Sequence, residues 1–150
     1  MRIVIYYVFA IFYIFILIVL LAKKYRVTWK DILFLTRKKQ FFWYGMFWFF
    51  YFKQYESLHY NQLSCHITLK LSKKAIIRNV FKRAIINYVS DNNLIKRPFN
   101  KQFYKIFITL NKGRIQELQK KIANSSKKDN ITYIKKEFET AWKNLIQKIK

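Results

Sequence analysis

Basic side chains are concentrated in residues 72–89, which read SKKAIIRNVFKRAIINYV. Ammonium and guanidinium groups bind phosphate oxygens, so several of them on one face of an element can hold a polyanion. If this stretch is a helix, positions 74, 78 and 82 lie on one line along it, because residues four apart are neighbours on a helix surface. Arg83 extends that line to the side. The basic residues of the stretch are Lys73, Lys74, Arg78, Lys82 and Arg83.

The opposite side of the same stretch is apolar. Its residues recur at the three- and four-residue spacing of an amphipathic helix, so the pattern predicts a helix over residues 73–89. One face of this helix would pack on a core and the other would meet the polyanion. The apolar residues are Ile77, Val80, Phe81, Ala84, Ile85 and Tyr88.

Side chains suited to catalysis are few and dispersed. The chain has only seven Asp plus Glu and two His, and the nearest two carboxylates, Glu137 and Glu139, lie two residues apart on a predicted helix and point to different sides. Two glycines are too few for a Gly-rich phosphate-binding loop. We therefore expect no catalytic residue in the protein, which argues against an independent protein nuclease.

Cysteine usage excludes a disulfide and argues against a metal site. The single cysteine, Cys65, excludes an intramolecular disulfide and favours a reducing compartment. One thiol with His59 and His66 does not make a convincing metal site, so we expect no metal to be bound by the protein.

The overall composition predicts both a folded core and an anionic partner. Thirty Lys plus Arg give a net charge of +23 in 150 residues, which is typical of proteins that bind nucleic acid or anionic membranes. Hydrophobic residues make up 53% and aromatic residues 20% of the chain, so it is not a disordered basic tail. The length suggests one domain.

The elements that would position the basic helix are helices and a few strands in alternation. Residues 63–71 alternate apolar and polar side chains and predict a half-buried strand, residues 46–52 predict a strand buried on both faces, and residues 104–110 predict a third strand. A polar linker is expected at residues 124–130. The remaining predicted helices cover residues 29–39, 114–123 and 131–149. Because helices and strands are mixed in this order, we predict an α+β fold, a two-layer sandwich of a small mixed sheet and helices.

Residues 3–22 form an uninterrupted apolar run that ends just before Lys23, Lys24 and Arg26. Twenty helical residues span about 30 Å, the thickness of a bilayer core, and the basic residues after the run place the rest of the chain in the cytoplasm. Two interpretations stay open: a transmembrane anchor on the inner face of the membrane, or upstream sequence read from a wrongly chosen start codon. We expect residues 1–22 to be an extension and residues 23–150 to be the RNA-binding domain.

Residues 72–85 resemble the signature of the bacterial ribonuclease P protein component. On the helix after a central strand, that family carries an alanine, then Arg-Asn, then Lys-Arg, which correspond here to Ala75, Arg78-Asn79 and Lys82-Arg83. The preceding HITLKLSKK also resembles the family's strand and lysine-bearing turn. The resemblance extends over residues 23–150.

The resemblance implies the fold of the second domain of ribosomal protein S5, and a role as the protein subunit of ribonuclease P. In that enzyme a catalytic RNA removes the 5′ leader from precursor tRNA, with Mg²⁺ bound mainly by the RNA, and the protein helps to bind the leader. It implies a cytoplasmic protein. The residues expected to bind RNA are Lys70, Lys73, Lys74, Arg78, Asn79, Lys82 and Arg83. The candidates for leader binding are Phe34, His66 and Thr68, with Trp43 and Tyr51 as further aromatic candidates.

Two other functions remain open on the sequence. A membrane-anchored basic structural or assembly protein would fractionate with membranes and bind anionic lipid through the lysine-rich part of the chain. A general RNA-binding protein would bind RNA without affecting tRNA 5′ maturation.

Overall fold

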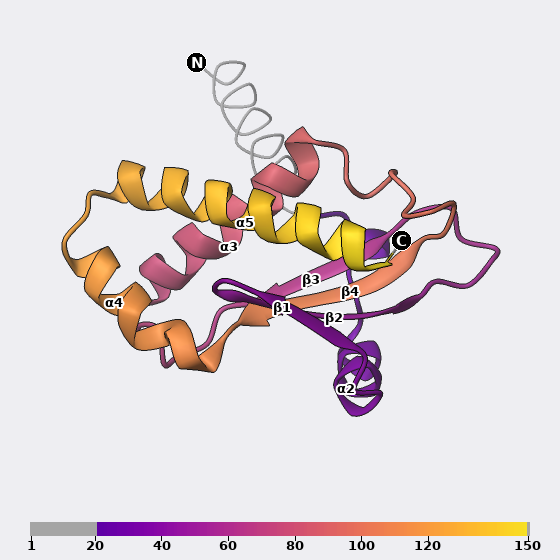
Figure 1. Cartoon of the computed structure of the whole chain (residues 1–150), viewed down its shortest axis with the longest axis horizontal. Coiled ribbons are helices and arrows are strands. Elements are labelled where there is room, and N and C mark those ends of the chain that lie inside the picture. Colours follow the sequence, from indigo (N-terminus) through magenta and orange to yellow (C-terminus); the bar gives the residue numbers. More distant parts are fainter. Residues whose placement is uncertain (1–20, 150) are drawn as a thin grey trace, which may run out of the picture.

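The structure is a computed structural model that describes residues 21–149. A short 3-10 turn, η1 (Lys23–Tyr25), precedes the first labelled helix (Figure 1). The helices are α2 (Trp29–Arg37), α3 (Ala75–Asp91), α4 (Ile115–Ala123) and α5 (Lys127–Ile149), with a second 3-10 turn, η2 (Lys112–Arg114), before α4. The strands are β1 (Phe41–Tyr44), β2 (Phe47–Lys53), β3 (Gln62–His66) and β4 (Tyr104–Leu110).

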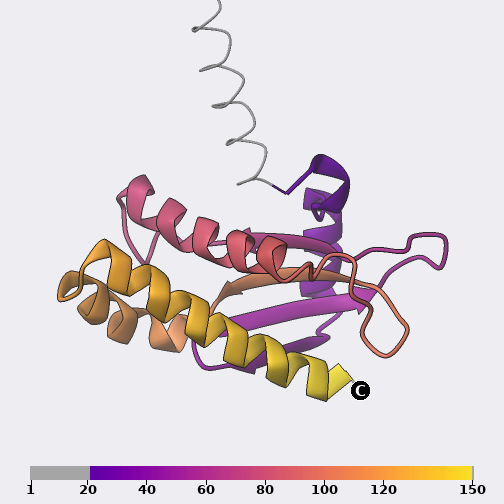
Figure 2. The same ribbon diagram turned by 90° about the horizontal axis from the view of Figure 1, so that it is seen from above.

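The four strands form one mixed sheet in the order β1-β2-β4-β3. Strand β2 is antiparallel to both β1 and β4, whereas β3 and β4 run parallel. Helix α3 makes the crossover between β3 and β4, which a parallel pair requires. Helices α3 and α5 lie side by side over one face of the sheet, and α2 packs on the other face (Figures 1 and 2). The predicted α+β sandwich is confirmed.

The main core lies between the sheet and the α3–α5 layer. Alternate residues of β2 point into it, and Phe47 and Phe49 are fully buried there. Their rings meet those of α5: Phe47 and Phe138 lie 5.4 Å apart between centroids, nearly perpendicular. Trp142 of α5 packs against Phe49 in the same way, at 6.2 Å. These contacts fix α5 across β2 and leave the other residues of β2 on the outer face of the sheet.

Sequence periodicity missed β1. Gly45, with φ +55°, turns the chain between β1 and β2, a conformation that glycine adopts without the strain an L side chain would suffer. The glycine therefore joins two strands, where the sequence pattern predicted only one, at residues 46–52. Residues 41–44 are all aromatic, so they carry no alternation that would mark a strand.

Most predicted boundaries are within two residues of the observed ones, and α3 begins and ends two residues later than predicted, but two boundaries are wrong by four residues or more. Strand β3 ends at His66, because residues 68–71 form a turn in which the Leu71 N–H donates to the Thr68 carbonyl at 3.1 Å. Leu69 is consequently 65% exposed instead of facing the core. Helix α5 begins at Lys127, four residues before the predicted start, because the Ser126 hydroxyl caps it by accepting from the Asp129 N–H at 3.2 Å.

Only the last two residues of the apolar run fall within the described part of the chain. Leu21 is 8% exposed and packs in the main core, and Ala22 caps the η1 turn. The predicted membrane anchor at residues 3–20 lies outside the described residues. None of the helices in residues 21–149 has the length and apolar character needed to cross a membrane.

Candidate nucleic-acid interface

Helix α3 presents part of the predicted basic cluster to solvent. Phe81, Ala84 and Ile85 are buried against the sheet and α5, as the apolar pattern predicts. Turning away from them, Lys82 and Arg83 are exposed. The helix therefore separates the packed face from a charged one, and its side chains can reach a phosphate backbone without disturbing the core.

Arg78 behaves differently from the other basic residues of α3. It is half-buried, and its Nη1 donates to the carbonyls of Ser72 at 2.7 Å and Lys73 at 2.8 Å. Long helical side chains point back toward the helix N-terminus, which brings this guanidinium onto the turn that precedes α3. Arg78 thus braces the turn, and only the remainder of its fork faces outward.

The turn before α3 carries Lys70, Lys73 and Lys74, all exposed. It is held from a second side by Gln119 of α4, whose Nε2 donates to the Lys70 carbonyl at 2.6 Å. The lysines therefore stand on a fixed support. We call the exposed members of this cluster the basic surface: Lys70, Lys73, Lys74, Asn79, Lys82 and Arg83.

The outer face of the sheet carries a second surface, made of aromatic rings. The rings of Phe41 and Trp48 are stacked, with centroids 5.1 Å apart and planes 5° from parallel. Phe50 lies 6.0 Å from Trp48 and 6.1 Å from Phe107 of β4, so the rings form a continuous row across three strands. We call the side chains of this face that reach solvent the aromatic sheet face: Phe41, Trp43, Trp48, Phe50 and Phe52. Phe107 lies on the same face but is only 9% exposed, because it packs with Val27 and Leu35.

Helix α2 lies over part of the aromatic sheet face, where Leu35 packs with Phe50 and Phe52. Its Phe34 meets Phe52 edge to face at 5.1 Å, and the Lys38 ammonium lies 5.2 Å from the centre of the Phe34 ring. The leader candidate Phe34 is therefore beside the sheet and partly exposed. An aromatic row with cations beside it has the composition of surfaces that hold single-stranded nucleic acid.

The other leader candidates are placed in different surroundings. His66 of β3 and Trp48 of β2 are both in register with Thr109 of β4, so the three side chains point to the same face of the sheet. Because Trp48 is on the outer face, His66 is there too. Thr68 lies beyond the end of β3. Trp43 is 56% exposed, whereas Tyr51 is buried in the main core against Tyr104 and offers no surface.

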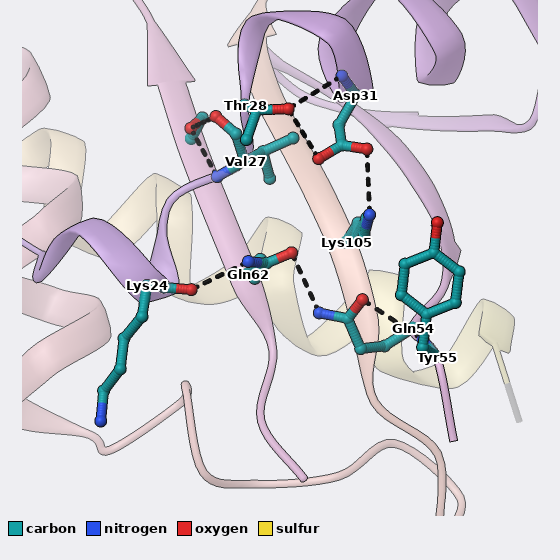
Figure 3. A network of polar contacts seen from close by, with 9 residues as sticks. Lys24, Val27, Thr28, Asp31, Gln54, Tyr55, Gln62 and Lys105 are labelled. Atoms are coloured by element: carbon teal, nitrogen blue, oxygen red, sulfur yellow. Dashed lines mark hydrogen bonds and ion pairs between the residues drawn. The ribbon is translucent and has the colours of Figure 1, made fainter. Parts of the chain in front are cut away.

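A network of polar contacts joins α2 to the β3–β4 side of the outer face (Figure 3). The buried Lys105 of β4 donates from Nζ to the Asp31 carboxylate of α2 at 2.9 Å, and the Thr28 hydroxyl donates to the same carboxylate at 2.8 Å. Burial acts to raise the pKa of the Asp31 carboxyl, but the hydrogen bonds from Lys105 and Thr28 outweigh it and hold that pKa below its usual value. Asp31 thus remains charged and holds α2 on the sheet.

The same network continues through two glutamines. Gln54, nearly fully buried, donates from Nε2 to the Gln62 Oε1 at 3.1 Å, and Gln62 in turn donates to the Lys24 carbonyl at 2.8 Å (Figure 3). Sequence reasoning missed these residues. One signal was present: Lys105 is the only charged residue in the predicted strand 104–110, and a lone cation in a buried strand requires a partner.

Groups that could perform acid–base or metal chemistry are dispersed. Within residues 21–149, no three His, Cys, Asp or Glu side chains come together closely enough to hold a metal ion. Cys65 is buried, and desolvation raises the pKa of its thiol to about 12, so it is a protonated core residue at neutral pH. The chemistry that the two surfaces offer is binding.

Comparison with known proteins gives a result at the level of structure. No protein-family model matches this chain, and no curated protein matches its sequence. The solved structures that are similar include the RNase P protein of Staphylococcus aureus and that of Thermotoga maritima. The match to the S. aureus protein has a TM-score of 0.60 at 16% identity, and it covers 81% of this chain and 94% of the S. aureus chain. The match to the T. maritima protein has a TM-score of 0.57 at 16% identity, and it covers 83% of this chain and 97% of the T. maritima chain. This chain therefore has the fold of bacterial RNase P proteins.

Proposed function

We propose that this protein is the protein subunit of ribonuclease P and assists a catalytic RNA in removing the 5′ leader from precursor tRNA. The observation that carries the proposal is the combination of that fold with Arg78-Asn79 and Lys82-Arg83 on α3. A fold alone supports many functions. The basic motif on the crossover helix is the feature that links this fold to the ribonuclease P protein component.

The basic surface would contact phosphates of the catalytic RNA. Lys82 and Arg83 are exposed, and the lysines of the preceding turn extend the same surface. Each phosphate that is neutralised releases condensed counterions, so the affinity for RNA should fall steeply as salt is raised. Arg78 would contribute mainly by holding the turn, because its Nη1 already bonds two carbonyls.

The aromatic sheet face would hold the single-stranded leader of the precursor. Its rings are supported from behind by the buried core and are bordered by Phe34 and Lys38. Stacking a base on an aromatic side chain contributes about 1–3 kcal/mol and accepts any base, which suits leaders of varied sequence. His66 lies on the same face and is a further candidate for leader contact.

The catalytic step would belong to the RNA subunit, with Mg²⁺ held mainly by the RNA. Within residues 21–149 no three His, Cys, Asp or Glu side chains come together closely enough to hold a metal ion, so we assign no metal ligand to the protein. Its contribution would be to bind and orient: the basic surface on the catalytic RNA, and the aromatic sheet face on the leader. Such a protein would act in the cytoplasm.

The decisive experiment is cleavage of precursor tRNA by a bacterial catalytic RNA at low Mg²⁺, with and without the full-length protein. We expect stimulation with correct 5′ ends. Lys82→Ala plus Arg83→Ala should weaken binding of the catalytic RNA and lower the slope of log K against log salt by about two. The matched control, Lys136→Ala plus Lys148→Ala, removes the same charge from exposed positions of α5 and should leave that slope nearer to wild type.

The alternative of a general RNA-binding protein has a distinct outcome in the same experiment. RNA binding that persists without any stimulation of cleavage, on several catalytic RNAs, would contradict the ribonuclease P proposal and favour this alternative.

Membrane attachment through residues 3–22 is a separate proposal, which rests on the apolar run in the sequence. It can coexist with either RNA-binding function. A genuine anchor on the inner face of the membrane should leave the native protein in the membrane pellet after alkaline carbonate extraction. Mass spectrometry of the native amino terminus tests the other interpretation, since a wrongly chosen start codon predicts a protein that lacks this run.

A further inference from the structure

Tyr55 is an exposed aromatic side chain in a fixed position just after β2. It is 68% exposed, one of the most exposed large apolar side chains in residues 21–149. Exposed tyrosines in loops usually sample several orientations, but the backbone of this one is bonded on both sides. Its N–H donates to the Gln54 side-chain Oε1 at 3.3 Å, and its carbonyl accepts from the Leu58 N–H at 3.0 Å.

The residue that fixes Tyr55 is itself buried. Gln54 is 6% exposed, its backbone N–H donates to the Phe103 carbonyl at 2.8 Å, and its side chain bonds Gln62. Tyr55 therefore stands on a buried amide network that joins the ends of β2, β3 and β4 (Figure 3). Because the backbone at Tyr55 is held in this way, little backbone conformational entropy is lost when a ligand binds the ring.

One side of the Tyr55 ring is occupied by a cation. The Lys105 ammonium lies 4.7 Å from the ring centroid, within the range of a cation–π contact, and is held there by Asp31 (Figure 3). The cation draws the π electrons toward itself. The other side of the ring, which the high exposure leaves open to solvent, becomes less electron-rich and better suited to stack on an electron-rich ring such as a nucleobase.

We propose that Tyr55 is a stacking site for one nucleobase of single-stranded RNA, at the end of the sheet beyond the aromatic sheet face. This inference rests on the proposed function, because it extends the path of a bound leader past Phe52 and Lys105. The charges around it agree with a nucleic acid: Lys53, Lys24 and Lys105 outnumber Asp31 and Glu56. A cationic partner, such as an arginine from another protein, would be repelled by a chain of net charge +23.

The test is binding of a single-stranded RNA that contains 2-aminopurine to the full-length protein. Stacking on Tyr55 should quench the 2-aminopurine fluorescence at one position of the strand. Tyr55→Ala should abolish that quenching and weaken binding by about 5- to 150-fold, the loss expected for one base–aromatic stack. Tyr55→Phe keeps the ring and should retain both signals.

The matched control is Tyr44→Ala. Tyr44 is also an exposed tyrosine, at 39%, but it lies at the end of β1 and in register with the core residue Phe47, away from the outer face. Removing its ring should leave the quenching unchanged. Circular dichroism and urea unfolding of each variant establish that it is folded.

Three outcomes would overturn the inference. Tyr55→Ala binds and quenches like the wild type, or it loses no more than Tyr44→Ala, or Tyr55→Phe loses as much as Tyr55→Ala. Failure of the proposed function is seen elsewhere: the wild-type protein would then not stimulate precursor cleavage, whatever the fluorescence at Tyr55. If cleavage is stimulated and Tyr55 has no effect on binding, the inference fails while the proposed function stands.

Discussion

Single side chains in this protein perform roles that their types alone do not reveal. Arg78 belongs by sequence to the RNA-binding motif, yet its guanidinium braces the turn before α3 through two carbonyls. Lys105 is a cation in a nucleic-acid-binding candidate, yet its ammonium is committed to Asp31 and to the Tyr55 ring. In both cases the structure uses the charge first to position its neighbours. The residues left free for phosphate are the exposed ones, such as Lys82 and Arg83.

Substituting Arg78 should therefore affect the fold as well as RNA binding. Hydrogen bonds from a charged donor contribute about 1.5–3 kcal/mol when buried, and since Arg78 is half-exposed we expect Arg78→Ala to cost about 1 kcal/mol of unfolding free energy. Arg83→Ala, at an exposed position of the same helix, should change it by less than about 0.5 kcal/mol. Urea unfolding measures both. Equal stabilities for the two variants would show that the bonds to the carbonyls of Ser72 and Lys73 contribute nothing.

Asp31 should make the protein sensitive to acid. Its folded-state pKa is held below the ordinary value, so its contribution is complete above the unfolded pKa of about 3.9 and is lost as the pH falls through the lowered value. We expect Asp31→Asn to be less stable than wild type at neutral pH, with the difference shrinking below about pH 4. Glu56→Gln, at an exposed carboxylate, is the control. A difference between wild type and Asp31→Asn that does not change with pH would refute this role.

At the scale of elements, α3 connects the core to the candidate interface. Its buried residues carry the packing, and the exposed ones carry charge, so the helix must stay packed against β3 and α5 for the basic surface to exist. Phe81 is 1% exposed in this packed face. It lies one residue before Lys82, so the loss of its packing would be felt directly at the charged face.

Phe81→Ala should accordingly lower the free energy of unfolding by about 3–5 kcal/mol, through lost burial and the cavity left behind. Chemical denaturation with the full-length chain measures it. Ile76→Ala is a suitable comparison, because Ile76 is exposed on the same helix and should have an effect below about 0.5 kcal/mol. A loss for Phe81→Ala no larger than that for Ile76→Ala would mean that α3 is not anchored as described.

At the scale of the whole molecule, one face of the sheet forms the core and the other carries the candidate binding surface. The face toward α3 and α5 is a closed aromatic core. Helix α2 lies on the opposite, outer face (Figure 1), and the row of rings on that face is only partly covered. The chain enters this arrangement at Leu21, whose side chain packs in the main core and whose carbonyl accepts from the Arg26 Nε at 2.6 Å. The end of the apolar run is therefore part of the folded domain.

Leu21→Ala should destabilise the domain by about 2 kcal/mol, the lower end for a buried leucine, because its site lies at the edge of the core. Leu33→Ala, at an exposed position of α2, is the matched control and should cost less than about 0.5 kcal/mol. Thermal unfolding of the full chain measures both. If Leu21→Ala is as stable as Leu33→Ala, the domain begins after Leu21.

The sequence by itself determined the fold class, the buried face of α3 and the position of strand β4. The observed bounds of β4 are the predicted ones. Periodic burial is a local property, so it is legible along the chain wherever apolar and polar residues alternate. The basic cluster could be predicted because its residues are close together along the chain. A Gly-rich loop could be excluded from the small number of glycines. Where every residue was aromatic, in residues 41–44, the signal vanished and β1 was missed.

Tertiary structure alone decided which charged side chains are free and which rings meet. The row of rings on the sheet is made by the register of three strands, and the Lys105–Asp31 pair joins residues 74 positions apart. Likewise, only the fold shows that Tyr51 is buried whereas Tyr55 is open. Pairing, burial and support by a second residue depend on distances between remote segments, and no local pattern in the sequence records those distances.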